Sequence, residues 1–245
     1  MTTQNLKFSP DISPGDVIAV GDIHGRLDLL TLFLDRVRDT GARVILLGDL
    51  IDRGPDCVGV LNRAKQLLDD PESWGLESFT VLRGNHEQLM IDAFEGPFQC
   101  VLEWSDNGGR TDKAWEMALH VEWVKKLPIW VTVGDTLFVH AGLRPGVSPA
   151  DTTAETMLWI REPFLKMGPK LGVWTDKIKR VVHGHTPYLD ERLGQVNVSA
   201  SGDRIGIDSG AVYSGILATY NATQGTFWKF YGPPLLPGAE NEETT

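Results

Sequence analysis

Three short apolar runs in the first third of the chain are each followed by a glycine-containing turn. The runs cover residues 17–20, 44–47 and 79–82, and amphipathic patterns at helical spacing fill residues 27–38 and 58–68 between them. Runs that are apolar at almost every position are typical of strands buried on both faces. Alternating strands and helices of this kind predict βαβ units, with functional loops gathered at the carboxyl ends of parallel strands.

The rest of the chain changes from a helical to a mainly β pattern. A helix is expected at residues 87–94. The tryptophan-rich stretch 99–127 has a helical period, interrupted by Asn107-Gly108-Gly109, and is a candidate cap over the functional loops. Residues 129–133 and 136–139 predict a hairpin around the Gly134-Asp135 turn. Further strands are expected at residues 180–182, 195–198, 204–207, 215–220 and 226–230.

The length and composition favour one domain. A chain of 245 residues that is 42% hydrophobic can bury one substantial core, so we expect an α/β domain over residues 1–232. Residues 233–245, with two prolines at the start and acidic residues near the end, predict a disordered tail. Without a run of about 20 apolar residues or a signal-peptide pattern, we expect a cytoplasmic protein with no membrane partner. Cys57 and Cys100 are expected to be reduced and non-catalytic.

The net charge of -10 argues against duplex nucleic acid as a partner. Proteins that track a nucleic-acid backbone need clustered Lys and Arg to neutralise its phosphates. The same negative charge would repel a phosphate substrate, unless metal cations and a few well-placed arginines reverse the field locally.

Five of the six histidines lie in short blocks, most of which directly follow an apolar run, and only His120 lies elsewhere. A chain that places its imidazoles and a few carboxylates at the ends of strands is expected to build a metal site. The blocks are GDIHG at 21–25, GDLIDRG at 48–54, GNHE at 84–87, HAG at 140–142 and HGHTP at 183–187.

A site for two metal ions needs one shared carboxylate and separate oxygen and imidazole ligands for each ion. Asp22 and His24 are two residues apart, so an extended backbone would point both side chains to the same side. Asp49 follows the next strand, where its carboxylate is expected to bridge the ions. Mixed oxygen and nitrogen ligands without cysteine suit Mn²⁺, Fe or Zn²⁺. The remaining ligand candidates are Asn85, His140 and His185.

Taken together, the five blocks are similar to those of the phosphoprotein phosphatase family of calcineurin-like metallophosphoesterases. The resemblance spans Asp22 to His185 and extends to the block IDSGAVY at 207–213. The elements Trp159-Ile160-Arg161 and His185-Thr186-Pro187 resemble the short bacterial and phage-type serine/threonine protein phosphatases most. The resemblance implies an α/β fold, a four-layer α/β/β/α sandwich with the site between two central mixed sheets.

The same resemblance implies a role for each matched residue, and these roles include two divalent metal ions, with Mn²⁺ expected first. A hydroxide between the ions is expected to attack phosphorus in line, without a phosphoenzyme. The implied ligands are Asp22, His24 and Asp49 for one ion, and Asp49, Asn85, His140 and His185 for the other.

Four further residues are expected to act on the substrate. Arg53 and Arg161 resemble the arginines that bind the phosphate group, with Asn85 beside them. His86 is similar to the general acid that protonates the leaving alkoxide, and Asp52 to the carboxylate that orients it. The alternatives are a surface ion pair between Asp52 and Arg53, and a solvated helix arginine at position 161.

Other conspicuous residues are expected to be structural. His183 corresponds to the histidine of His-Gly-His that is not a ligand, and His120 lies on a helical face where we expect solvent exposure. The tryptophans, including Trp104, Trp115 and Trp123, are expected in the core rather than in a cage around the substrate.

The first expected substrate is phosphoserine or phosphothreonine in a protein, with phosphotyrosine or a small phosphate ester also within reach. The main alternative is a diadenosine tetraphosphate hydrolase with the same fold and metals. Such enzymes resemble this chain less, because they carry Ala where it has Asp52 and an aromatic residue where it has Thr186. A catalytically silent binding scaffold is a second alternative, opposed by the complete set of matched ligands. A nucleic-acid phosphodiesterase is opposed by the net charge.

Overall fold

The computed structural model describes residues 11–166, 177–187, 195–199 and 202–235, and the strands within them form two five-stranded sheets. The first sheet has the order β10-β9-β1-β2-β3, with β1 (Val17–Val20), β2 (Arg43–Leu46), β3 (Ser78–Val81), β9 (Ile216–Asn221) and β10 (Thr226–Tyr231). The second has the order β4-β5-β6-β8-β7, with β4 (Trp130–Val133), β5 (Thr136–Val139), β6 (Arg180–His183), β7 (Asn197–Val198) and β8 (Arg204–Gly206).

Both sheets are mixed, and their central strands are parallel. The run β1-β2-β3 is parallel, whereas β9 pairs with β1 in the antiparallel sense. In the second sheet β5, β6 and β8 are parallel, while β4 forms the expected hairpin with β5. The predicted first strand is confirmed residue for residue, and the next two begin one residue earlier than expected. The strand expected at residues 195–198 is shorter, covering only 197 and 198.

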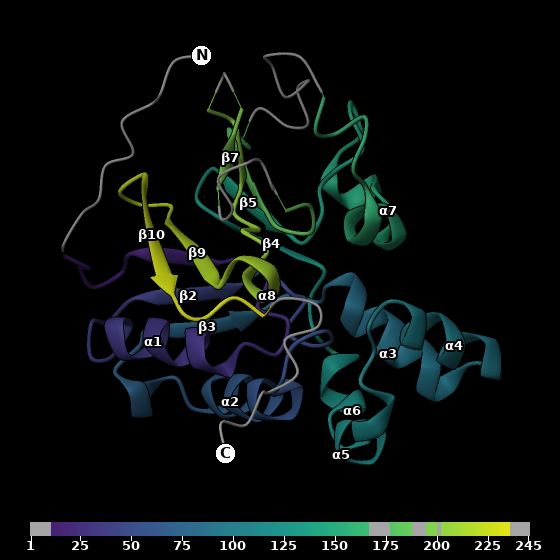
Figure 1. Ribbon diagram of the computed structural model, residues 1–245. Coiled ribbons are helices and arrows are strands. Elements are labelled where there is room, and N and C mark those ends of the chain that lie inside the picture. Colours follow the sequence, from purple (N-terminus) through teal and green to yellow (C-terminus); the bar gives the residue numbers. More distant parts are fainter. Residues whose placement is uncertain (1–10, 167–176, 188–194, 200–201, 236–245) are drawn as a thin grey trace.

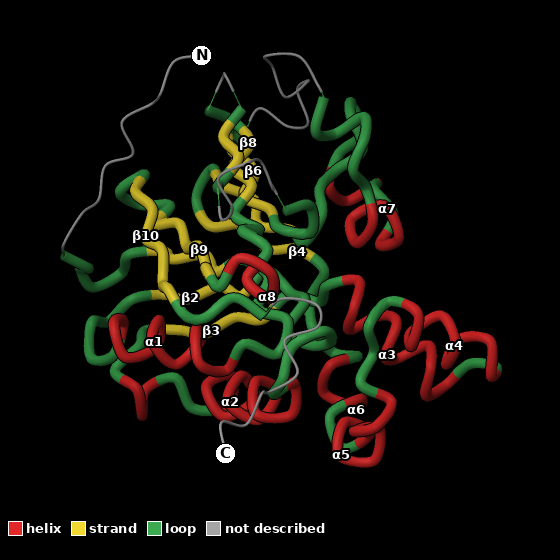
Figure 2. The backbone as a smooth tube through the Cα atoms, viewed as in Figure 1, coloured by secondary structure: helices red, strands yellow, loops and turns green. Residues whose placement is uncertain are grey.

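The helices fall into a covering pair, a group at one side and two short elements (Figures 1 and 2). The covering pair is α1 (Leu27–Val37) and α2 (Cys57–Asp69). The side group is α3 (Asn85–Glu95), α4 (Phe98–Asp106), α5 (Ala114–Ala118) and α6 (Val121–Val124). The short elements are α7 (Ala154–Trp159) and α8 (Ala211–Ser214). Single 3₁₀ turns form η1 (Glu72–Trp74), η2 (Thr111–Lys113) and η3 (Pro149–Asp151).

The side-chain alternation of each strand shows how the layers stack. Along β1, Ile18 and Val20 pack with the residues of α1 and α2, whereas Val17 and Ala19 face the opposite side. That inner face meets the second sheet, where Phe138 belongs to the same cluster as Val17 and Ala19. Because successive side chains of a strand point to opposite faces, a strand between two apolar layers must be apolar throughout. The nearly continuous runs in the sequence have this origin.

The second sheet is covered on its outer face by α7. Leu137 and Val139 of β5 pack there against Met157 of α7 and Phe164 of the following turn. The described chain therefore has the layer order helix, sheet, sheet, helix, which confirms the expected α/β/β/α sandwich. A single domain over residues 1–232 stays a prediction, and residues 236–245 of the expected tail lie outside the described residues.

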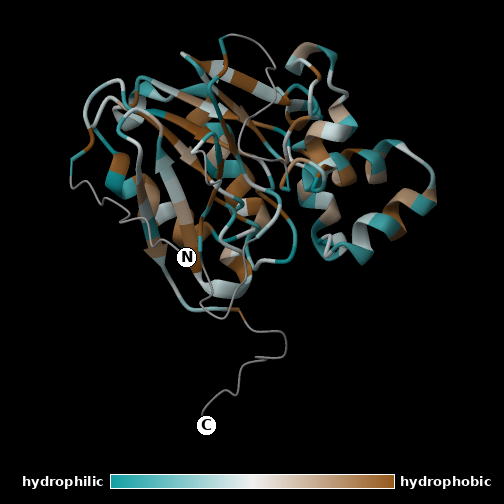
Figure 3. Ribbon diagram, turned by 90° about the horizontal axis from the view of Figure 1, so that it is seen from above, coloured by the Kyte–Doolittle hydropathy of each residue, from teal (hydrophilic) through white to brown (hydrophobic). Residues whose placement is uncertain are grey.

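The helical stretch expected at 99–127 is confirmed, but two expectations about its side chains are wrong. The side group projects from the sheets in two perpendicular views (Figures 1 and 3). His120 is buried rather than exposed, and its Nδ1 accepts a hydrogen bond of 2.9 Å from Trp123 Nε1. Trp115 is 86% exposed rather than part of the core. The helical period of the sequence shows which residues share a face of a helix. It does not show whether a neighbouring element covers that face.

The two cysteines are free, as expected. Cys57 is buried, and this burial raises the pKa of its thiol to about 12, so that the reactive thiolate is disfavoured at neutral pH. None of the helices in the described ranges combines the length and apolar character needed to span a bilayer.

Candidate metal centre and active site

The predicted site residues come together where the parallel strands of the two sheets end. Asp22 and His24 follow β1, Asp49 follows β2, and His140 follows β5. Hydrogen bonds across the gap between the sheets join these loops. His140 Nδ1 lies 3.0 Å from the carbonyl oxygen of Leu47, and the backbone N–H of residue 185 donates to the Asp22 carboxylate at 3.0 Å. The site therefore lies between the two sheets, as the resemblance implied.

The backbone of these loops is unusual. Among the described residues, six other than glycine have positive φ, and five of these six are predicted site residues in the loops at the centre. Left-handed backbone costs such residues roughly 1–3 kcal/mol each and is found most often at functional sites. The expectation of an extended backbone between Asp22 and His24 is wrong, because φ at His24 is 44°. The five site residues are His24, Asp49, Asp52, Arg53 and His185.

A first group of potential ligand atoms surrounds His24 and Asp49. One atom from each of these residues and from His86 lies within 4.8 Å of the others. His24 Nδ1 lies 2.7 Å from the carbonyl oxygen of Ile51 and donates to it, which makes Nε2 the acceptor atom of the ring, 3.7 Å from Asp49 Oδ2. Arg53 Nη1 donates to this Nε2 at 2.8 Å. Burial lowers the pKa of His24 to about 3, so the ring is the neutral form that binds metals.

A second group is formed by Asp49, His140 and His185, with Asn85 between the two histidines. Asn85 Oδ1 lies 2.8 Å from His140 Nε2 and 2.8 Å from His185 Nδ1. Burial alone would lower the pKa of His140, but the adjacent carboxylate of Asp49 raises it to about 10. Asp49 belongs to both groups, which is the arrangement that a bridging carboxylate requires.

Among the predicted aspartate and histidine ligands, Asp22 is the one that neither group contains. It is buried, and its carboxylate accepts the backbone N–H of His185 at 3.0 and 3.2 Å. Burial, followed by the nearby charge of Asp208, raises the pKa of Asp22 well above its ordinary value. Burial likewise raises the pKa of Asp208 to about 6. A pair of buried carboxylates in this state favours a cation beside them.

The donor set fits two divalent cations. A buried charge without an opposite charge beside it costs several kcal/mol of folding free energy. A bound cation offsets this cost because it neutralises the carboxylates around it. Asp22, Asp49 and Asp208 bring three buried carboxyl groups to one centre, together with the neutral imidazoles of His24 and His185. His185 Nε2 is buried and has no hydrogen-bond partner among the described residues, although buried polar atoms normally have one. Oxygen and imidazole ligands of this kind suit Mn²⁺, Fe or Zn²⁺.

Asp52 and His86 form a buried pair beside the first group. His86 Nδ1 lies 2.7 Å from Asp52 Oδ2, and His86 Nε2 is 4.0 Å from Asp49 Oδ2. Asp52 is fully buried, so the alternative of a surface ion pair with Arg53 is wrong. Burial raises the pKa of Asp52, whereas its hydrogen bonds from His86 and Trp104 oppose that rise. His86 falls within the first group by distance, and because its Nδ1 is hydrogen-bonded to Asp52, Nε2 is the nitrogen on the side of Asp49.

The two arginines expected to bind phosphate differ in placement. Arg53 has an exposed side chain whose tip reaches His24, as described above. Arg161 is exposed and lies just after α7. It is near enough to His185 that its positive charge, after burial and the charge of His140, helps to lower the pKa of His185 to about 3.

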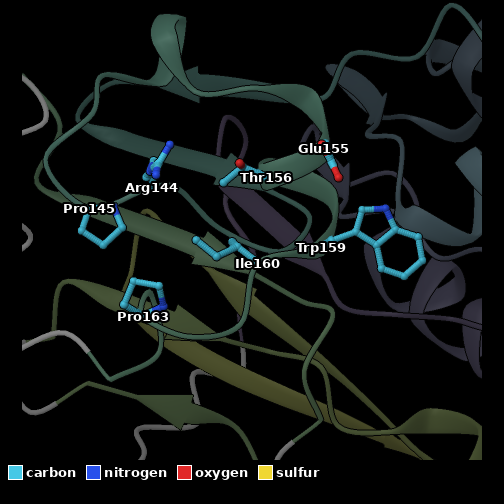
Figure 4. Close-up of a pocket in the computed structure, with 7 residues that line it drawn as sticks. All are labelled: Arg144, Pro145, Glu155, Thr156, Trp159, Ile160 and Pro163. Carbon is cyan, nitrogen blue, oxygen red and sulfur yellow. The ribbon is translucent and has the colours of Figure 1, made fainter.

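A cavity of about 580 Å³ lies beside α7, on the side of the site where His185 is found (Figure 4). The Trp159 ring is at one end of the cavity, 6.2 Å from the His185 ring between centroids. Arg144 is at the other end in the close-up view (Figure 4). A cavity of this size can hold several groups of a ligand bound at the adjacent centre.

Two buried acids contribute to the site without having been given a role from the sequence. Glu87 accepts the backbone N–H groups of Gly84, Asp49 and Leu50, each at 2.8 Å, and thereby fixes the loop after β2 to the loop after β3. Asp208, the other acid, accepts the N–H of residue 210 at 2.9 Å. Glu87 belongs to the block at 84–87 and Asp208 to the block at 207–213. Their places in these blocks were the sequence signal that could have identified them as site residues.

Gly84 is needed for the close approach of these loops. A Cβ at this position would lie 2.2 Å from Asp49 Oδ1 and 2.4 Å from the Asp49 backbone nitrogen. Any other residue would therefore displace the carboxylate expected to bridge the metals.

His183 lies outside both groups of potential ligands in the described chain. Its Nδ1 donates to the Gly184 carbonyl oxygen at 3.1 Å, and its ring packs edge-on against Phe164 at 5.1 Å. Burial lowers the pKa of His183 to about 4, so the ring is a neutral, packed side chain.

Similarities to known proteins agree with this geometry. One relative is serine/threonine-protein phosphatase 1 of Salmonella typhimurium, 34% identical over 221 residues that cover 82% of this chain and 89% of the relative. Another is a symmetrical bis(5'-nucleosyl)-tetraphosphatase of Nitrosospira multiformis, 31% identical over 134 residues that cover 54% of this chain and 45% of the relative. Among solved structures, a cold-active protein tyrosine phosphatase superposes with a TM-score of 0.62 at 20% identity, covering 91% of this chain and 81% of that one.

The family model described as calcineurin-like phosphoesterase matches residues 15–208, which include all the predicted site residues. The two sheets with flanking helices are those of the metallophosphoesterase fold, and the chain belongs to the calcineurin-like phosphoesterase family.

Proposed function

We propose that the protein is a metal-dependent phosphomonoester hydrolase whose main substrates are phosphoserine and phosphothreonine in proteins. The observation that carries this proposal is the buried hydrogen bond of 2.7 Å between Asp52 and His86. It supplies an oriented imidazole at the edge of the metal centre, where a proton donor to a leaving group would stand.

The chemistry of the leaving group explains why this pair favours a monoester. A serine or threonine side chain leaves phosphorus as an alkoxide, which is a poor leaving group unless it is protonated as the bond breaks. The leaving group of a dinucleoside tetraphosphate is itself a phosphate, which departs readily without such help. A positioned general acid is therefore far more useful to a phosphomonoesterase than to a phosphoanhydride hydrolase.

In this proposal two divalent cations, with Mn²⁺ as the first choice, share the centre. When bound, such cations neutralise phosphate charge and make a water molecule nucleophilic at neutral pH. One ion would be held by Asp22, His24 and Asp49. The other would be held by the set that shares Asp49 with it, namely Asp49, Asn85, His140 and His185.

The remaining residues bind the substrate and move a proton. Arg53 and Arg161 present guanidinium groups that can each hold two phosphate oxygens, with the Asn85 amide nearby. Asp52 accepts a hydrogen bond from Nδ1–H of His86, and its carboxylate would stabilise the imidazolium form, in which Nε2, the nitrogen that faces the centre, also carries a proton. His86 Nε2 then donates its proton to the departing oxygen.

The similarity to the Salmonella serine/threonine-protein phosphatase supports this substrate class, because it extends over 89% of that protein. The similarity to the Nitrosospira tetraphosphatase covers 45% of that protein. Hydrolysis of a dinucleoside tetraphosphate is nevertheless the second candidate, since the family includes proteins of both names.

A side-by-side measurement of kcat/KM separates these candidates. The Mn²⁺-loaded protein would be given a phosphothreonine peptide, a phosphotyrosine peptide and diadenosine tetraphosphate. We expect the phosphothreonine peptide to have the highest value. A dominant value for diadenosine tetraphosphate would reject the substrate assignment, and no turnover of any of the three would support the silent-scaffold alternative.

A further inference from the structure

We propose that Trp104 is a positioning residue for the general acid, acting through Asp52. The indole N–H holds the carboxylate that in turn holds His86, so the three side chains form one buried chain of hydrogen bonds. This inference rests on the proposed phosphomonoesterase function, and it gives the side group of helices a part in catalysis.

The contacts are direct. Trp104 Nε1 donates to Asp52 Oδ2 at 2.9 Å and to Oδ1 at 3.1 Å. Asp52 Oδ2 also accepts from His86 Nδ1 at 2.7 Å, and in the described chain the indole is the only hydrogen-bond donor to Oδ1. Trp104 is 1% exposed and Asp52 is 0% exposed, so water cannot easily replace the indole.

The polypeptide around Trp104 is built for this contact. Trp104 lies in the last turn of α4, and the chain then passes directly over its ring at Gly109. A Cβ at Gly109 would lie 2.6 Å from Trp104 Cδ1 and 2.6 Å from the Trp104 carbonyl oxygen, so a larger residue there would displace the indole or the loop itself. The carbonyl oxygen of Gly108 accepts the backbone N–H of Arg53 at 2.9 Å. The last turn of α4 and the loop that follows it therefore hold both Asp52 and its neighbour Arg53.

A second contact ties the same loop to the turn that carries Asp52. Arg110 Nη1 donates to the carbonyl oxygen of Gly54 at 2.9 Å. Asp52 and Arg53 both have left-handed backbone, with φ of 71° and 65°. Such a turn keeps its shape only where the surrounding structure holds it. The loop after α4 provides this support at Asp52, Arg53 and Gly54.

The physical role of the indole follows from the burial of Asp52. A buried carboxylate keeps its charge only when hydrogen-bond donors replace the water it has lost. With one donor from His86 and one from Trp104, the carboxylate is held in a single orientation. Without the indole, Asp52 would be free to rotate or to take up a proton, and either change would release the Nδ1 proton of His86 from its position.

The test is Trp104→Phe, which keeps an aromatic ring but removes the N–H. Trp123→Phe is the matched control, because Trp123 lies in the same side group and also donates an indole hydrogen bond, to His120. The two variants and the wild type would be assayed with Mn²⁺ on 4-nitrophenyl phosphate, whose leaving group departs without protonation, and on a phosphothreonine peptide.

We expect Trp104→Phe to lower kcat about tenfold on the phosphothreonine peptide, part of the roughly 10²- to 10⁴-fold that a general acid contributes. On 4-nitrophenyl phosphate the loss should stay within about twofold, since little acid catalysis is at stake there. Trp123→Phe should change neither rate by more than about twofold. Equal losses of Trp104→Phe on the two substrates, or none, would overturn the proposal.

Two further variants guard against a folding artefact. Gly109→Ala crowds both the indole and the carbonyl oxygen of Trp104 and should lower kcat more on the peptide than on 4-nitrophenyl phosphate, so an equal loss on the two substrates would contradict the positioning role. In an Asp52→Asn background, Trp104→Phe should have no further effect on the ratio of the two rates, because the indole acts through that carboxylate. A wild type inactive on both substrates would instead reject the proposed function itself.

Discussion

The two edges of the candidate centre are built in opposite ways. The acid edge, formed by Asp52, His86 and Trp104, is at most 1% exposed, and every side chain in it is hydrogen-bonded to another. The open edge, formed by Trp159 and Arg161, is exposed, with 38% exposure at Trp159, and it borders a cavity. The two edges therefore suit different tasks. The buried acid edge is already organised before substrate binds, whereas the exposed open edge can adjust to the bound substrate.

This contrast has a physical cause. Proton transfer depends on fixed orientation and on exclusion of water, which only a packed environment provides. Binding of a phosphate group relies on the charge and the planar fork of a guanidinium, which an exposed arginine presents at the end of a long side chain. Damage to the acid edge should therefore appear in kcat and depend on the leaving group, whereas damage to the open edge should appear mainly in KM.

The largest effect should come from the centre that both edges share. Asp49→Asn removes the carboxylate common to both ligand groups, and we expect kcat to fall about a thousandfold or more on every substrate. Chelation of the wild type should cause a similar loss that Mn²⁺ reverses. Full activity in metal-free buffer would contradict the two-metal centre.

The next effect tests the acid edge. His86→Asn should lower kcat on a phosphothreonine peptide by about 10²- to 10⁴-fold, since the proton donor is gone. The loss on 4-nitrophenyl phosphate should be much smaller. Steady-state kinetics on the two substrates measures this difference, and an equal loss on both would remove His86 from the acid role.

A smaller effect is expected at the open edge. Arg161→Ala should raise KM about tenfold for both substrates with a smaller change in kcat, because one of two phosphate-binding guanidinium groups is lost. Arg144→Ala, which changes an exposed arginine lining the cavity beside Trp159, is the control and should leave the kinetics on 4-nitrophenyl phosphate within about twofold. If Arg144→Ala matched Arg161→Ala on this substrate, the assignment of the phosphate-binding arginine would be wrong.

The smallest effect on activity should come from His183→Ala. This ring is buried against Phe164 outside both ligand groups, so its loss should reduce the free energy of unfolding by about 1–3 kcal/mol. The metal-loaded protein should keep kcat within about threefold at a temperature where it stays folded. Thermal unfolding and kinetics on one sample check both points, and a collapse of activity comparable to that of Asp49→Asn would show that His183 had been misassigned.

Much of the fold could be predicted from local patterns. The run at residues 17–20 is a strand with the expected limits because both of its faces are buried, which leaves an unbroken apolar signature. The site blocks were recognisable because the carboxyl ends of parallel strands meet at one edge, so residues far apart in the sequence could be assigned to one centre. His140 after β5 and Asn85 after β3 lie 55 positions apart and meet where the strand ends of the two sheets face each other.

The features that were missed depend on contacts that no local pattern contains. The positive φ of His24 follows from the packing of its loop and not from its spacing to Asp22. Trp104 was expected to be core, and it is buried, but its partner Asp52 lies 52 positions away. The exposure of Trp115 and the burial of His120 were misjudged because helical periodicity does not show which face a neighbouring element covers.

The measurement that tests the central claim most directly is the ratio of kcat/KM for a phosphothreonine peptide to kcat/KM for diadenosine tetraphosphate, in the wild type and in Asp52→Asn. A buried acid built for an alkoxide leaving group predicts a wild-type ratio above one. It also predicts a ratio about a hundredfold lower in Asp52→Asn, because only the peptide reaction depends on the proton that His86 donates to the leaving group. A wild-type ratio below one, or a ratio that Asp52→Asn leaves unchanged, would contradict the account.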